Sequence, residues 1–145
     1  MKLFLYIMME VIIAFLITIM FFLSGIDKIK KFSGVTKSIQ KNFIISTLPI
    51  WFYQLSLIFV ILLEIFAPLI IVYSSVTYSL ESLALYSCYA LVAFTILATI
   101  MYHPPNKKKE YHYFMKNLSI VGGLLALAEL YKPPDSESYN RMLLN

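Results

Sequence analysis

A mostly apolar stretch at residues 50–72, IWFYQLSLIFVILLEIFAPLIIV, limits most strongly what this chain can fold into. As one helix it is long enough to cross a hydrocarbon layer of roughly 30 Å. It also carries a carboxyl group, Glu64, and a charged side chain near the centre of a bilayer costs roughly 2.5 kcal/mol or more. We therefore expect this helix to turn Glu64 toward protein or water, with the other apolar segments supplying its neighbours.

Three further apolar segments lie at residues 3–23, 83–102 and 114–131. Hydrophobic residues make up 60% of the 145-residue chain and charged residues only 14%. A soluble domain of this length has too little interior to bury so much apolar surface. The sequence therefore predicts a single membrane domain over residues 1–145, an all-α, multi-pass integral membrane four-helix bundle. Polar connectors are expected at residues 24–49 and 103–113, with a polar tail at 132–145.

The positive charges are concentrated near two of the connectors. Residues 24–49 hold five lysines and residues 103–113 hold three; with Lys116 these make nine of the twelve Lys and Arg residues. Loops rich in Lys and Arg stay on the cytoplasmic or matrix side of a membrane. Two spans separate the basic loops, so we expect both loops inside and both termini outside. Membrane topology then accounts for the net charge of +4 without a nucleic-acid partner.

The first connector contains signals for local structure. Gly25 and Gly34 indicate breaks in the chain, and Asp27 and Lys28 are expected to form a local ion pair at the membrane interface. Apolar residues near helical spacing at positions 35–44 predict a short amphipathic helix in the headgroup layer.

Glu10 and Glu64 are the candidate intramembrane polar site. From the expected span ends, and at 1.5 Å of rise per residue, both carboxyl groups lie roughly 10–12 Å below the outer boundary. At one depth on adjacent helices they could share a proton, hold a cation or contact a quinone headgroup. The alternative is that each is protonated, hydrogen-bonded and locks helix packing.

A consecutive glycine pair, Gly122 and Gly123, lies in the fourth apolar segment. Small residues in a lipid-embedded helix allow the backbone of a neighbouring helix to approach closely. We therefore expect this pair to be a helix-packing contact.

The sequence shows no combination of residues typical of catalysis. His103 and His112 lack the spacing and the cysteine partners of a metal site, and Cys88 is the single cysteine. The expectation is no catalytic residue, no metal and no cofactor, which favours a role other than that of an enzyme.

Three motifs resemble the DoxX-like family of small four-helix membrane proteins. They are FFLSGIDKIKKFSG at residues 21–34, LLEIFAPLII at 62–71 and FMKNLSIVGGLLALA at 114–128. Glu10 lies in the first helix, where an early arginine common in that family is missing. The resemblance implies a four-helix bundle associated with respiratory chemistry, and hence an energy-transducing membrane such as the mitochondrial inner membrane or the bacterial plasma membrane.

These observations lead to three hypotheses about function. The first is a non-catalytic accessory subunit of a larger, respiratory, quinone-linked membrane complex, with membrane lipids and other membrane subunits as partners. The second is a quinone-linked oxidoreductase subunit that uses Glu10 and Glu64 to handle protons, with quinone as a partner. The third is a small transporter or channel, although four helices are few for a pore and no inverted repeat is visible.

Overall fold

The computed structural model describes residues 2–42, 48–103, 105, 108 and 110–133, and every structural statement below concerns these residues. The chain forms five helices, and the described part contains no strand. In chain order the helices are α1 (Lys2–Lys30), α2 (Phe32–Asn42), α3 (Ile50–Thr77), α4 (Glu81–Tyr102) and α5 (Tyr111–Leu130). Four of them are long and apolar enough to cross a membrane, namely α3, α4, α5 and the segment Ile7–Lys30 of α1. The predicted all-α four-helix membrane bundle is confirmed.

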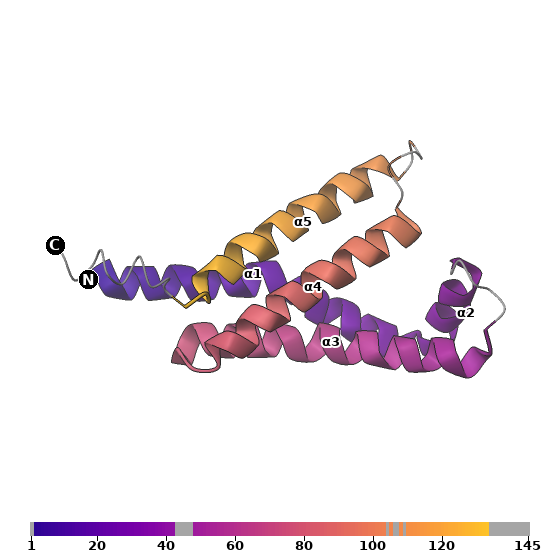
Figure 1. Ribbon diagram of the computed structural model, residues 1–145, viewed down its shortest axis with the longest axis horizontal. Helices are drawn as coiled ribbons and strands as arrows, with labels where there is room; N and C mark the ends of the chain where they lie inside the picture. Colours follow the sequence, from indigo (N-terminus) through magenta and orange to yellow (C-terminus); the bar gives the residue numbers. More distant parts are fainter. Residues whose placement is uncertain (1, 43–47, 104, 106–107, 109, 134–145) are drawn as a thin grey trace.

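The four long helices pack as two pairs (Figure 1). α1 lies along α3, and α4 lies along α5, while α3 also contacts α4 and α1 also contacts α5. The short helix α2 packs against α3 and α1 at one end of the molecule. At that end the α4–α5 pair leans away from the α1–α3 pair (Figure 1).

Contacts between helices define the two ends of the bundle. At one end Tyr78, directly after α3, reaches back to Glu10 of α1, and Tyr131, directly after α5, donates a hydrogen bond to the Ile71 carbonyl oxygen at 3.1 Å. At the opposite end Asn117 of α5 donates to Thr99 of α4 at 2.9 Å. Neighbours along the chain therefore run antiparallel. Figure 1 shows α2 at the second of these ends, which we call the basic end because the lysine-rich segments meet there.

The shared core combines small and large side chains, and the small ones let the helix backbones come close together. The fully or nearly fully buried residues include Ala14, Ala67, Ala84, Cys88 and Ala128, with Ile71, Leu91, Leu124 and Leu127 filling the space between them. Large apolar side chains instead cover the outer faces of the helices, where Phe59 is 71% exposed and Leu97 is 62% exposed. This inverse arrangement suits a bundle surrounded by lipid tails.

Two predicted boundaries differ from the structure. The first span was expected to end at residue 23, but α1 continues to Lys30. The second span was expected to end at residue 72, but α3 continues to Thr77. Gly25 and Gly34 do not break the chain, because both lie inside helices. The hydropathy of residues 24–30 resembles that of a loop, but packing against α3 keeps them helical. The predicted tail lies outside the described residues from position 134 onward, as does part of each basic connector.

The short amphipathic helix expected in the first connector corresponds to α2. It covers residues 32–42, and positions 43 and 44 of the predicted helix lie outside the described residues. Val35 and Ile39 are half-buried on it, whereas Lys37 and Lys41 are exposed. α2 therefore presents an apolar side to the bundle and a basic side away from it.

Candidate functional site

The most polar cluster inside the bundle is formed by Glu64, Lys28 and Ser24. Glu64 on α3 is 2% exposed, and the Lys28 amine donates to both of its carboxylate oxygens at 2.8 and 2.7 Å. Ser24 Oγ donates to Oε1 of Glu64 at 3.2 Å and accepts from the Lys28 amine at 2.6 Å. The Lys28 ammonium has three N–H donors, and they face three oxygens of these two partners. We call this cluster the intramembrane ion pair.

The sequence of α1 explains why these groups meet. Ser24 and Lys28 are four residues apart and therefore share one face of the helix. Gly25, beside Ser24, faces the α3 backbone so closely that an added Cβ would lie 2.9 Å from Cγ1 of Ile65 and 3.2 Å from Cβ of Glu64. The side chain of a larger residue at this position would force the two helices to shift apart.

Burial of the pair has a cost that its geometry offsets. Removing two charges from water costs several kcal/mol each, and the cost is recovered only where the contacts are close and the remaining hydrogen-bonding groups are satisfied. The Lys28 side chain keeps 22% exposure toward the basic end, and its amine lies 5.9 Å from the centre of the Phe94 ring. The pair therefore fixes α1 against α3 without leaving a free charge in the bundle.

An apolar cleft adjoins the ion pair on the side of α2 and α4. It has a volume of about 370 Å³ and is bounded by side chains of α1, α2, α3 and α4. Most of its lining is apolar, including Leu57, Val60, Phe94, Leu97, Ala98 and Met101. Its polar groups are Lys28, already bound to Glu64, and Ser38 and Tyr102, which are hydrogen-bonded to each other. We call it the interhelical cleft.

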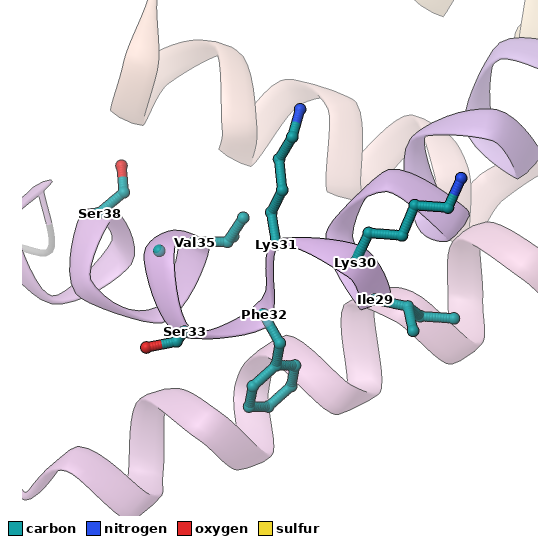
Figure 2. Close-up of a pocket in the computed structure, with 8 residues that line it drawn as sticks. Ile29, Lys30, Lys31, Phe32, Ser33, Val35 and Ser38 are labelled. Atoms are coloured by element: carbon teal, nitrogen blue, oxygen red, sulfur yellow. The ribbon is translucent and has the colours of Figure 1, made fainter.

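A second, open hollow of about 590 Å³ lies at the corner where α1 meets α2. Figure 2 shows its lining residues, which include Ile29, Lys30, Lys31, Phe32, Val35 and Ser38. Lys31 extends to the same side of the corner as Val35 and Ser38, while Phe32 points the opposite way (Figure 2). Val35 and Ser38 also line the interhelical cleft, so the two spaces adjoin. We call this second space the corner hollow.

The structure does not bring Glu10 and Glu64 together. The Tyr78 hydroxyl donates to Oε2 of Glu10 at 3.2 Å, at the end of the bundle opposite α2. Glu64 faces Gly25 instead, and Gly25 is roughly 22 Å from Glu10 along α1 at 1.5 Å per residue. The expectation of equal depth is wrong because it took residue 72 as the end of the second span, whereas α3 continues to Thr77. It also did not pair Glu64 with residues 24–28.

Glu10 has a small polar cavity of its own. The cavity measures about 30 Å³, and Ser74, Ser75, Tyr78, Glu81 and Tyr131 line it together with Glu10. It is large enough for one water molecule, and Ser74 Oγ, buried beside it, has no hydrogen-bond partner among the described groups. A bound water here would satisfy Ser74.

The two predicted packing glycines differ in their surroundings. An added Cβ at Gly123 would make an ordinary contact with Ile17 of α1 at 3.5 Å, whereas one at Gly122 would meet no atom within 4 Å. Gly123 therefore lies at a contact between α5 and α1, and Gly122 faces away from the bundle. The closest backbone approach occurs at Gly25, which the sequence had suggested as a break.

Lys28 and Ser24 are the site residues that the sequence analysis missed. Asp27 was expected to pair with Lys28, but it pairs with Lys31 at 3.0 Å on the exposed side of α1. Electrostatics could have predicted Lys28 as the partner of Glu64, because a carboxylate buried in a membrane helix needs a cation nearby. Lys28 is the first lysine after the expected first span. His103 Nδ1 and Glu110 Oε2 form a hydrogen bond at 2.6 Å. The described residues contain no group of three potential metal ligands.

Comparisons of the chain with protein-family models, curated proteins and solved structures found no match.

Proposed function

We propose that this chain is a non-catalytic accessory subunit of a larger membrane complex, and that the outer face of α5 packs against another membrane subunit. One observation carries the proposal: α5 has the lowest mean hydropathy of the four spanning helices, and only 22% of its membrane-length segment is buried in the bundle. A helix of this kind is poorly suited to face lipid alone. A neighbouring membrane helix would cover it.

The side chains on the outer face of α5 support this packing. Ser119, Gly122 and Ala126 are exposed and lie at helical spacing on one side of the helix. Small residues spaced in this way let a second helix approach closely in lipid, where van der Waals contact drives association. We call Ser119, Gly122 and Ala126 the small-residue face.

The intramembrane ion pair supports a structural role for Glu64. Both carboxylate oxygens accept hydrogen bonds from Lys28, and one also accepts from Ser24. A carboxylate that carries protons during turnover would need to lose and regain such partners. Its present arrangement instead joins two helices, as an accessory subunit requires.

The proposal also covers the orientation of the chain in the membrane and the kind of membrane that holds it. The basic end, with α2 and Lys108, is placed inside, and both chain ends are placed outside, following the lysine distribution. The three motifs similar to the DoxX-like family suggest a respiratory, quinone-linked complex in an energy-transducing membrane. These assignments depend on sequence pattern alone.

Native mass analysis of the chain, extracted from its own membrane in mild detergent, tests the proposal. The wild-type chain should migrate in a large assembly. Gly122→Leu should lower the ratio of assembled to free chain at least ten-fold and leave the melting temperature of the chain itself unchanged. Gly34→Leu is the matched control, since both glycines have nothing within 4 Å of an added Cβ. A wild-type chain that runs as a monomer, or a Gly122→Leu chain that stays assembled, would contradict the proposal.

A further inference from the structure

The interhelical cleft and the corner hollow differ in chemistry although they adjoin. The cleft is lined mostly by apolar side chains of α2, α3 and α4, such as Leu57, Phe94 and Ala98. The corner hollow is open and carries Lys30 and Lys31 on its rim. A ligand that filled both would need an apolar part and an anionic part joined to each other.

The charge around the corner hollow is strongly positive. Residues 27–42 contain five lysines and a single acidic residue, Asp27. Asp27 is paired with Lys31, and Lys28 is paired with Glu64. The excess cations are Lys30, Lys37 and Lys41, which are all exposed. Basic surfaces on the inner side of a membrane attract anionic lipid headgroups, at about 1 kcal/mol for each lysine.

The lining of the cleft excludes other kinds of occupant. An extended peptide segment would leave backbone N–H and C=O groups unpaired among apolar side chains. A quinone headgroup needs hydrogen-bond donors, but the three Lys28 donors face Glu64 and Ser24, and the hydrogen bond between Tyr102 and Ser38 uses one of the two hydroxyl donors of that pair. A hydrocarbon chain has no polar group to satisfy. The volume of about 370 Å³ lies within the range of buried small-molecule sites.

We propose that an anionic phospholipid binds here, with one acyl chain in the interhelical cleft and its phosphate headgroup in the corner hollow beside Lys30. The acyl chain lies in the cleft bounded by α1, α2, α3 and α4, at the end of the bundle where Figure 1 shows α2. The headgroup lies at the junction of α1 and α2, which is the part of the hollow drawn in Figure 2. This site goes beyond the proposed role as a subunit, because it is built entirely within this chain.

Lipid titration followed by native mass spectrometry tests the site. The purified full-length chain, depleted of lipid, is titrated with phosphatidylglycerol or with phosphatidylcholine carrying the same acyl chains. One phosphatidylglycerol should bind at least five-fold more tightly than phosphatidylcholine, as expected from about 1 kcal/mol for one lysine. Equal affinity for the two lipids would overturn the proposal.

Two pairs of variants test the two halves of the site. Ala98→Trp fills the cleft and should reduce phosphatidylglycerol binding at least ten-fold, whereas Ala93→Trp, the same change on an exposed side of α4, should not. Lys30→Gln should weaken phosphatidylglycerol binding about five-fold and leave phosphatidylcholine unchanged, whereas Lys132→Gln at the other end should have no effect. Binding by Ala98→Trp equal to that of the wild type would contradict the assignment of the cleft.

A measurement on the wild-type chain avoids the risk that Ala98→Trp does not fold. Phosphatidylglycerol with a photoreactive group at the end of one acyl chain is crosslinked in a bilayer, and the labelled residues are mapped. Labels should concentrate on cleft residues such as Val60, Phe94 and Met101. Labels spread evenly over the outward residues of all four spanning helices, or displacement of the lipid by an equimolar short-chain quinone, would overturn the proposal.

Discussion

Glu64 is the residue whose chemistry places the strongest demand on the rest of the bundle. It is 2% exposed inside a spanning helix, and the Lys28 amine contacts both of its oxygens. Hydropathy predicted that Glu64 must face protein or water, because a carboxylate in lipid is costly. Its partner could not be predicted, because Lys28 lies in a segment whose composition resembles a loop. Lys28 and Glu64 are 36 residues apart in the chain. A contact over this separation produces no repeating pattern in the sequence of either helix.

The first prediction concerns the free energy that couples Lys28 and Glu64. Lys28→Met leaves a buried carboxylate without a cation and should destabilise the bundle by about 3 kcal/mol, at the low end for broken buried pairs because Lys28 is partly exposed. Glu64→Gln should destabilise it less, since the lysine can extend toward the basic end. The double variant should be more stable than Lys28→Met alone, as an uncharged pair needs no compensation.

Thermal unfolding of the four proteins in one detergent measures this coupling. Ser56→Ala serves as a control, since the Ser56 hydroxyl bonds only to the backbone of its own helix. Additive effects of the two substitutions would show that the residues do not interact in the folded protein.

At the scale of the helices, apolar length predicted most of the fold. The expected starts at residues 50, 83 and 114 lie close to the observed starts Ile50, Glu81 and Tyr111. Hydropathy did not predict where α1 ends, because α1 continues to Lys30 through polar residues that pack on α3. It also could not rank the glycines, because what faces Gly25 and Gly122 depends on how the helices pack and not on the hydropathy of the segments that contain them.

The second prediction tests the close approach of α1 and α3. Gly25→Ala would place a Cβ 2.9 Å from Cγ1 of Ile65, so the helices must shift, and overpacking of this kind costs about 1–3 kcal/mol. Gly34→Ala, with open space around its Cβ, should stabilise α2 by up to about 1 kcal/mol, the difference in helix propensity. Melting temperatures of the two variants should move in opposite directions, and a Gly25→Ala protein as stable as the wild type would refute the close packing.

At the scale of the whole molecule, charge is distributed along the bundle axis. The basic end carries α2, Lys108 and Lys116, whereas the other end carries Glu10, Glu81 and Glu129 with one described lysine beyond α5. This asymmetry was visible in the sequence, and the antiparallel packing of the four long helices brings the lysine-rich segments to one end. The described lysines of both loop regions therefore lie at one end of the molecule, and a bias of this kind favours placing that end on the inner side of a membrane.

Cysteine accessibility in sealed membrane vesicles tests most directly whether four helices cross the membrane with the basic end inside. Single cysteines at Lys108 and Ser79, in a Cys88→Ala background, report on the basic end and on the turn between α3 and α4. A membrane-impermeant maleimide should label Ser79→Cys from the outer side only and Lys108→Cys only after the vesicles are opened. Labelling of both positions from the same side would contradict the four-span account.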